Sequence, residues 1–212
     1  MHSRSRPGRS PRAPLAFIDP CLPTVSDAVP CSPSWVYEIK HDGYRLQAHL
    51  REKRVRLFTR TGIDWTDRFP RIVDAVAGLS ITSAIFDCEA IIADEDGRSD
   101  FDALHSRARE DEVCAYAFDL LQLDGEDLRG RPLVERKRQL ARTLRRPRDG
   151  IVLSEDLTGD GERIFTHACK LGLEGIVAKR LDSPYRSGRA KCWIKVKNRN
   201  APAFLRVMEG TF

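Results

Sequence analysis

Apolar and polar residues alternate with a period of two along several short segments of this chain, and that alternation predicts β-strands. The segments with this pattern are residues 35–40, 45–50, 55–59, 84–93, 113–121, 151–153, 176–179 and 193–197. The polar run 51–54 separates the second and third of these strands, which predicts a hairpin.

Other segments carry apolar residues at the three- and four-residue spacing of a helix. Helices are predicted over residues 69–79, 101–108, 133–144 and 162–171. Ser99 or Asp100 is the expected N-cap of the second helix, Pro132 starts the third, and Gly172 ends the fourth. Because hairpins and helices are interspersed, the sequence predicts an α+β fold whose sheets are largely antiparallel.

Composition places the chain among globular proteins. Its 212 residues are 41% hydrophobic and 32% charged, which suits one large domain or two small ones. No apolar run approaches the length of a membrane span, and the N-terminus has no apolar core of the kind found in secretory signals. The six cysteines form no Cys-x-x-Cys pair and the five histidines share no metal-ligand spacing, so we predict neither disulfides nor a zinc site; Cys88 and Cys114 are expected to be buried thiols.

Charge is distributed unevenly along the chain. Four arginines in residues 1–14 supply most of the formal net charge of +5, and their Ser-, Pro- and Arg-rich setting predicts a disordered basic tail. Residues 45–71, 129–148 and 170–199 are strongly basic, whereas residues 87–127 hold fourteen acidic and three basic side chains. This arrangement favours a phosphate-binding face, with an ordinary solvated surface as the alternative.

The segment from Glu38 to Arg45 reads Glu-Ile-Lys-His-Asp-Gly-Tyr-Arg and carries the clearest chemistry. On a strand Glu38 and Lys40 share one face, which sets a hydrogen-bond acceptor beside a nucleophilic amine. Gly43 lacks a Cβ, so the backbone there can turn sharply or approach a ligand closely. The alternative interpretation is a solvated strand end with a charge pair and a turn glycine.

Five further motifs follow in order, and together the six resemble those of the covalent nucleotidyltransferases: ATP-dependent DNA ligases, RNA ligases and mRNA capping enzymes. They are Phe58-Thr59-Arg60-Thr61-Gly62, Phe86-Asp87-Cys88-Glu89, Tyr116-Ala117-Phe118-Asp119-Leu120-Leu121, Leu173-Glu174-Gly175-Ile176-Val177-Ala178-Lys179 and Trp193-Ile194-Lys195-Val196-Lys197. The residues of these motifs are most similar to those of the ligase domain of bacterial end-joining enzymes and their short stand-alone relatives. Cys88 departs from the glycine usual at its position.

The resemblance implies a fold and a set of residue roles. The fold would be two largely antiparallel sheets flanked by helices, a nucleotidyltransferase fold similar to ATP-grasp. Lys40 would attack ATP, Glu38 would accept from the adenine amine, and Phe118 would stack on the purine. Glu89 and Glu174 would bind Mg²⁺ (or Mn²⁺), although Glu89 has the ribose hydroxyl as an alternative partner. The cations that would neutralise the phosphates are Arg45, Arg60, Lys179, Lys195 and Lys197. Taken singly, Phe118 would be read as a core aromatic and each glutamate as a surface residue.

The sequence therefore predicts a DNA ligase (ATP) that seals nicks through lysyl-AMP and 5′-adenylated DNA. Residues 15–199 would be the adenylation domain and residues 200–212 a C-terminal tail without an OB-fold. Nicked or broken double-stranded DNA is the expected partner. An OB-fold or end-joining protein that acts in trans is a further candidate partner. The expected location is the bacterial cytoplasm, at the nucleoid, with no membrane contact. RNA ligation or capping, and a non-catalytic nucleic-acid-binding remnant, are the alternatives.

Overall fold

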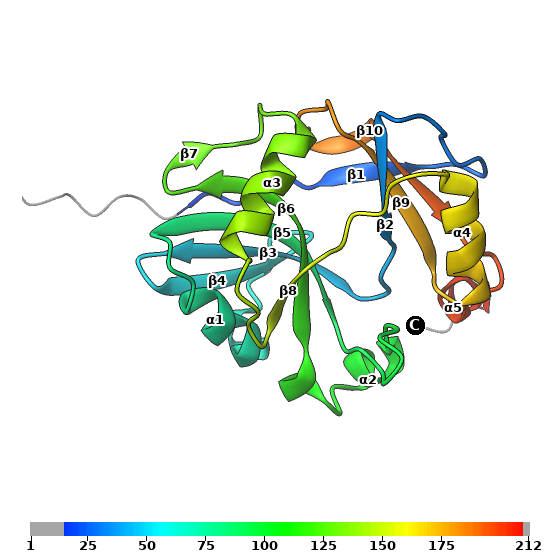
Figure 1. The fold of residues 1–212 in the computed structure, drawn as a ribbon. Coiled ribbons are helices and arrows are strands. Elements are labelled where there is room, and N and C mark those ends of the chain that lie inside the picture. The colour runs from blue at the N-terminus through cyan, green and yellow to red at the C-terminus, as the bar shows by residue number, and fades with distance from the viewer. Residues whose placement is uncertain (1–14, 210–212) are drawn as a thin grey trace, which may run out of the picture.

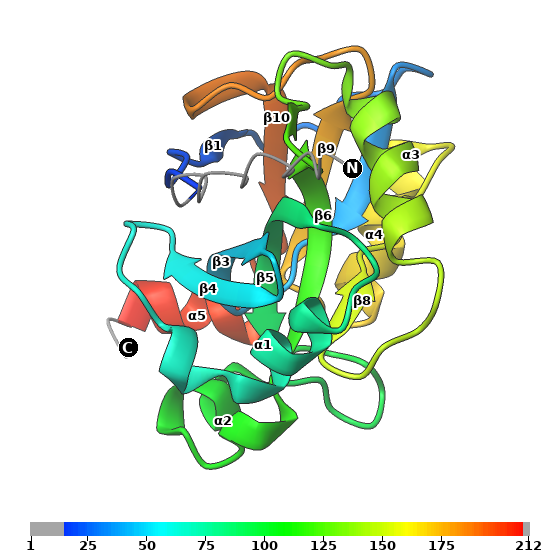
Figure 2. The ribbon, with the colours of Figure 1, turned by 90° about the vertical axis from the view of Figure 1, so that its left-hand side faces the viewer.

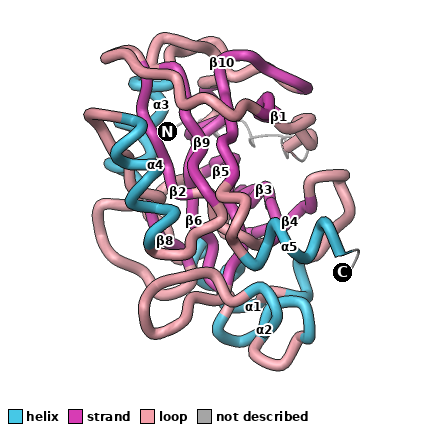
Figure 3. Tube along the Cα trace, turned by 90° about the vertical axis from the view of Figure 1, so that its right-hand side faces the viewer, coloured by secondary structure: helices cyan, strands magenta, loops and turns pink. Residues whose placement is uncertain are grey.

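The computed structural model describes residues 15–209, which form an α+β fold of two sheets with helices around them (Figure 1). Figure 3 shows the strands in the middle of the molecule and the helices at its periphery. This confirms the predicted fold class. The predicted disordered tail, residues 1–14, lies outside the described residues.

The first sheet has the strand order β1-β10-β9-β2. Its strands are β1 (Cys21–Val25), β10 (Gly188–Lys197), β9 (Gly175–Arg180) and β2 (Trp35–Ile39). The pairs β10–β9 and β9–β2 are antiparallel, whereas β1 runs parallel to β10. Because β9 lies between β2 and β10, this sheet brings the Lys40, Glu174 and Lys195 motifs together from opposite ends of the sequence.

The second sheet has the strand order β4-β3-β5-β6-β7, with β8 added beside β6. Its strands are β4 (Arg54–Thr59), β3 (Tyr44–Arg51), β5 (Ser83–Ile91), β6 (Cys114–Leu123), β7 (Glu126–Asp127) and β8 (Ile151–Leu153). Only β6–β8 is parallel among its pairs. In Figure 2 strands β3, β4 and β5 lie below β1 and β10 of the first sheet.

Helices lie on the outside of both sheets. The α-helices are α1 (Pro70–Ala77), α2 (Phe101–Ser106), α3 (Leu133–Thr143), α4 (Gly161–Lys170) and α5 (Pro202–Glu209), and two short 3₁₀ turns cover Thr66–Arg68 and Glu110–Glu112. Asp100 caps α2 by accepting a hydrogen bond from the Ala103 N–H, which decides between the two predicted caps.

Alternation along the strands separates the core from the space between the sheets. In the first sheet Tyr37, Ile176 and Ala178 pack with Ala168 of α4 in one apolar cluster. Their neighbours Glu38, Val177 and Lys179 line a cavity whose other wall comes from the second sheet. Because successive side chains of a strand point to opposite faces, this register places the charged motif residues between the two sheets.

Gly43 is needed for packing between strands. A Cβ built on Gly43 would lie 2.3 Å from the Ala90 carbonyl oxygen, so any side chain would push β3 away from β5. The sequence suggested a sharp turn or a close ligand as the reason for this glycine. The structure shows instead that the close neighbour is Ala90 of β5. Cys88, at the usual glycine position, is fully buried and donates its S–H to the Leu46 carbonyl oxygen at 3.3 Å. Cys114 is only partly buried, so the prediction of a buried thiol was wrong there.

The predicted C-terminal tail contains helix α5, which the sequence interpretation missed. Arg206 of α5 forms an ion pair with Asp42 of the lysine motif and lies 3.6 Å from the Asp102 carboxylate. Strand β1 was also missed, because Pro23 interrupts a short segment whose partner is β10, far away in the sequence. Among residues 15–209, no helix has both the length and the apolar character required to cross a bilayer.

Candidate active site

Lys40 lies at the first position after β2, where the strand pairing with β9 ends. Its backbone N–H donates to the Gly175 carbonyl oxygen at 2.9 Å, which continues the ladder by one residue. Its Nζ donates to Glu174 Oε2 at 2.5 Å, and the Glu174 side chain is only 8% exposed. Gly175 follows at φ 137°, where a Cβ would lie 2.1 Å from the Val196 carbonyl oxygen. The glycine therefore allows β9 to start close against β10 and holds Glu174 beside the lysine.

Glu38 is a buried carboxylate between two ammonium groups. Lys179 Nζ donates to its Oε2 at 2.8 Å, and Lys137 Nζ lies 2.6 Å from its Oε1. Burial lowers the pKa of Lys179, and the Glu38 carboxylate works against that shift. The sequence predicted the pair of Glu38 and Lys179 in one site, but it gave no role to Lys137.

Glu89 comes from β5 in the opposite sheet and lines the same cavity as Lys40. Burial raises the pKa of Glu89 to about 7, because the nearby cations Lys40 and Arg45 offset only part of the desolvation and Glu174 adds like-charge repulsion. Two carboxylates thus lie near the amine, one from each sheet. A cation bound between them would favour their ionised forms.

Arg45 is held by protein groups. Its guanidinium donates two hydrogen bonds to Asp87, at 2.9 and 2.6 Å, and a third to the Cys21 carbonyl oxygen at 2.7 Å. Asp87 is fully buried and also accepts from the Tyr185 hydroxyl at 2.7 Å. A fourth, longer hydrogen bond runs from its Nη2 to the Tyr185 hydroxyl at 3.5 Å. Arg45 borders the cavity, but four of its five N–H donors thus have protein partners. The predicted phosphate ligand therefore has a structural role that joins β1, β3 and β5.

An aromatic wall closes the end of the cavity near Glu38. Phe118 and Trp193 meet edge to face, with ring centroids 6.1 Å apart. Lys179 Nζ lies 4.2 Å from the centroid of the Phe118 ring and 4.1 Å from that of Trp193. The indole Nε1 of Trp193 is buried without a hydrogen-bond partner among the described residues. The wall thus offers the half-buried Phe118 ring for stacking.

Further cations line the cavity. Arg60, Arg189 and Lys195 line it, and burial together with the neighbouring Lys40 and Lys197 lowers the pKa of Lys195. Lys197 does not line the cavity, although its Nζ lies 3.8 Å from Glu174 Oε1. Such a group of cations, next to two carboxylates, suits the phosphates of a nucleotide together with a divalent ion.

The cavity between the sheets has a volume of about 280 Å³ and brings together eight of the ten predicted site residues. These eight are Glu38, Lys40, Arg45, Arg60, Glu89, Phe118, Lys179 and Lys195. Glu174 and Lys197 complete the set through their contacts around the amine. The lining residues that the sequence did not single out are Leu22, Pro23, Ile39, His41, Ser154, Val177, Arg189 and Trp193.

Some of the missed residues had a signal and others had none. His41 and Trp193 lie inside quoted motifs, so their positions could have marked them. Arg189 stands alone upstream of the last motif, and nothing local distinguishes it from other surface arginines. Lys137 belongs to a basic amphipathic helix in which its neighbours carry the same charge.

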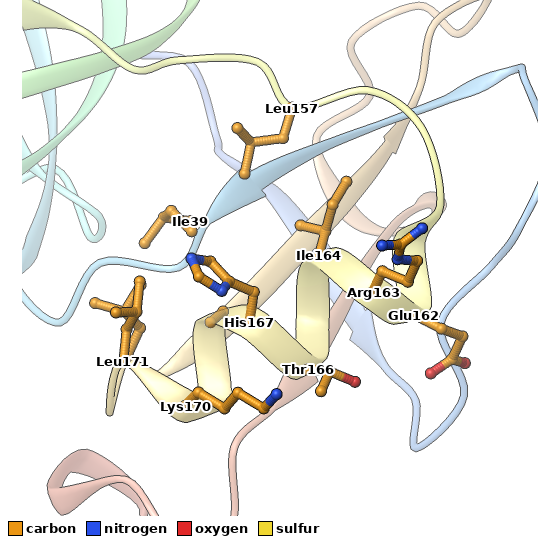
Figure 4. A pocket seen from close by; sticks show the side chains of 11 residues that line it. Ile39, Leu157, Glu162, Arg163, Ile164, Thr166, His167, Lys170 and Leu171 are labelled. Carbon is orange, nitrogen blue, oxygen red and sulfur yellow. The ribbon is translucent and has the colours of Figure 1, made fainter.

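A second hollow, of about 600 Å³, lies along α4 and is lined by apolar side chains such as Leu157, Ile164 and Leu171 (Figure 4). Figure 4 shows His167 of α4 directed toward Ile39 across it. It contains none of the predicted site residues. The smaller cavity between the sheets is therefore the better candidate, because the convergent charged groups are there.

Among residues 15–209, no cluster of three or more His, Cys, Asp or Glu side chains is arranged to hold a metal ion. Mg²⁺ does not need such a cluster, because it often takes one or two carboxylates together with phosphate oxygens and water. Glu89 and Glu174 meet that requirement only if a phosphate is present. The donor set thus fits a metal that arrives with a nucleotide.

Comparison with known proteins places this chain in a family. The model of the ATP dependent DNA ligase domain matches residues 22–197. The multifunctional non-homologous end joining protein LigD of Pseudomonas aeruginosa is 44% identical over 167 residues, which cover 77% of this chain and 20% of that protein. The chain thus spans about a fifth of the length of this relative.

Two solved structures are similar to the fold. The ligase domain of LigD from M. tuberculosis superposes with a TM-score of 0.71 at 33% identity, over 84% of this chain and 60% of that one. A mycobacterial DNA ligase D complexed with ATP and MES superposes with a TM-score of 0.66 at 34% identity, over 83% of this chain and 60% of that one.

Proposed function

The chain belongs to the ATP-dependent DNA ligase domain family, and from this premise we propose that it carries AMP on Lys40 and transfers it to DNA. The amine would attack the α-phosphorus of ATP, forming a phosphorus–nitrogen bond as the bond to pyrophosphate breaks. The AMP would then pass to the 5′-phosphate at a nick. The 3′-hydroxyl would displace the AMP and seal the strand.

The observation that carries this proposal is the position of the Lys40 amine. It is fixed by the Glu174 carboxylate at 2.5 Å, inside a cavity with Glu89 on the opposite wall. Holding a nucleophile in one geometry removes much of the entropic cost of bringing the reactants together. A lysine on a solvated strand end would have neither the buried acceptor nor the facing wall.

The two ends of the cavity suit the two ends of ATP. Phe118 provides a ring for base stacking, worth about 1–3 kcal/mol for a single base, and Glu38 provides an acceptor for the adenine amine. Arg60, Lys195 and Lys197 are assigned to the phosphates, in agreement with their positions in the cavity or beside Glu174. Lys179 was also expected to bind a phosphate, but its Nζ lies against Glu38 and the Phe118 ring. Binding of ATP by the related mycobacterial ligase D supports the choice of nucleotide.

Glu89 and Glu174 would hold Mg²⁺ (or Mn²⁺) when the nucleotide is bound. The ion would neutralise charge on the phosphate oxygens and so favour displacement at phosphorus. In the free protein Glu174 Oε2 is occupied by the Lys40 ammonium. The amine must lose a proton before it attacks ATP, and that loss removes the positive charge, so the Glu174 carboxylate would be released for the metal that arrives with the nucleotide.

Nicked or broken double-stranded DNA is the proposed substrate, and the relatives named for non-homologous end joining favour breaks. An OB-fold or end-joining protein acting in trans would be the partner, and the bacterial cytoplasm, at the nucleoid, would be the location. RNA ligation or capping shares the lysine chemistry and is the second candidate. A binding remnant without activity would not need an amine fixed against a buried carboxylate.

Incubation with ATP labelled in the α-phosphate, followed by a denaturing gel, tests this function. We expect an acid-labile, alkali-stable adduct that is lost in Lys40→Arg, because the guanidinium stays protonated at working pH. Arg189→Lys is the matched control, since it changes another cavity cation but leaves the nucleophile. A wild-type chain that takes no label, or a Lys40→Arg chain that labels normally, would refute the proposal.

A further inference from the structure

Helix α3 sends two consecutive cations into the protein interior, where one meets Asp119 and the other meets Glu38. Arg136 is fully buried and bonds the two oxygens of Asp119 at 2.8 and 2.9 Å, next to Phe118 in the sequence. Lys137 is 6% exposed and lies 2.6 Å from Glu38. One helix thus supports the neighbourhood of the stacking ring and of the base-reading carboxylate.

Lys137 is enclosed by carboxylates. Besides Glu38, it donates to Asp156 Oδ1 at 2.5 Å, and the Asp156 side chain is 35% exposed at the rim. Burial alone would lower the pKa of Lys137, but the Glu38 and Asp156 carboxylates outweigh it and raise that pKa. Lys137 therefore stays an ammonium ion throughout the working range of an enzyme.

Glu38 keeps a free lone pair in spite of its two neighbours. Its Oε2 accepts from Lys179, whereas the approach of Lys137 to Oε1 is close but poorly angled, so Oε1 has no hydrogen bond. Glu38 also lines the cavity. Two cations on one carboxylate restrict the directions in which its oxygens can face. The orientation of Glu38 thus decides whether the pocket presents an acceptor to the edge of a base.

We propose that Lys137 is a positioning residue for nucleotide choice, which holds the Glu38 side chain oriented as an acceptor of the exocyclic amine of adenine. The idea rests on the proposed function and adds to it a residue from outside the motifs. With Lys137 in place, a base that carries an oxygen at the same position would set that oxygen against the carboxylate. Without Lys137, Glu38 loses one of its two counter-charges and the freedom of its side chain increases.

The alternative is that Lys137 only ties α3 to the first sheet. The two explanations differ in what a neutral substitute does. Loss of a structural tie weakens the use of every nucleotide by one common factor. Loss of positioning weakens the use of ATP but spares an analogue without the exocyclic amine, because that analogue donates no hydrogen bond to Glu38.

Inosine triphosphate is the appropriate probe, because it replaces the amine of adenine with a carbonyl oxygen and leaves the sugar and phosphates unchanged. We would measure kcat/KM for self-adenylylation and its inosine equivalent in the wild type, Lys137→Met and Lys137→Arg. Arg138→Met is the matched control, since Arg138 is exposed on the same helix and loses the same charge. Urea unfolding of each variant would report its stability.

The ATP-to-ITP ratio of kcat/KM is expected to fall about tenfold or more in Lys137→Met, the scale of one hydrogen bond to a charged group. It should change less than about threefold in Lys137→Arg and Arg138→Met. If Lys137→Met does not fold, Lys137→Gln takes its place, since an amide can still bond Glu38. An ATP-to-ITP ratio that lies between the wild-type value and one, the value without discrimination, supports the proposal. An unchanged ratio in a folded neutral variant would overturn it. Absence of any adduct in the wild type would instead contradict the proposed function.

Discussion

The buried pair of Arg45 and Asp87 gives the sharpest prediction about this fold, because it assigns a motif arginine to structure. Asp87→Asn keeps the volume and removes a carboxylate that accepts three hydrogen bonds, two from the Arg45 guanidinium and one from the Tyr185 hydroxyl. Asp87 is fully buried and the Arg45 side chain is 14% exposed, so solvent cannot replace the lost counter-ion.

Breaking a buried pair on one side costs about 3–5 kcal/mol. For a domain of this size the melting temperature should fall by on the order of 10 °C. Tyr185→Phe removes one hydrogen bond to the same carboxylate and should cost about 1.5–3 kcal/mol. The assay is urea unfolding followed by tryptophan fluorescence, in which the midpoint falls and the slope m stays constant.

Asp27→Asn is the matched control, because its pair with Arg199 is 85% and 71% exposed and such pairs contribute little. The reasoning fails if Asp87→Asn unfolds at the wild-type midpoint while adduct formation is lost. That outcome would mean that Arg45 acts on the nucleotide and that Asp87 orients it without stabilising the fold.

Three further predictions concern pH, metal and salt. Burial lowers the pKa of His49 to about 4 from 6.5, so the unfolded chain takes up a proton at a higher pH than the folded protein. The contribution of His49 to the free energy of unfolding should be fully present above pH 6.5 and decline toward pH 4, by at most about 3 kcal/mol. His49→Phe should flatten this decline in unfolding curves, and an equal decline in both proteins would refute the assignment. Glu89→Gln and Glu174→Gln should each raise the Mg²⁺ concentration needed for half-maximal adduct formation, and an unchanged Mg²⁺ titration in both would exclude them as ligands. Deleting residues 1–14 removes four arginines and should flatten the slope of log K against log salt for nicked DNA by up to about 3–4; an identical slope would show that the tail does not contact DNA.

The sequence predicted the parts of this molecule that are encoded locally. Strands such as β2 and β9 follow from alternation, and α4 follows from helical spacing that ends near Gly172. The cavity residues were found because each motif combines several chemically informative residues at fixed spacing. The sheet pairing of β2 with β9 then brings two of these motifs together.

Long-range contacts account for what was missed. Lys137 contacts Glu38 across 99 positions of sequence, and no local pattern distinguishes it from the other basic residues of α3. The sequence also gave no sign that Arg45 pairs with Asp87, because the two residues lie on different strands; its contact with a phosphate stays a prediction. Strand β1 exists because β10 provides a parallel partner for it. No local pattern in residues 21–25 predicts that pairing.

The central claim is that Lys40 carries AMP on its way to DNA, and a chase of the labelled protein tests it most directly. The AMP-labelled chain would be freed of ATP and mixed with duplexes containing a single nick, one all DNA and one with RNA strands. We expect that label leaves the protein and appears first on the 5′-phosphate and then as free AMP, while the DNA strand is sealed. Label that stays on the protein, or that moves only to the RNA duplex, would contradict it.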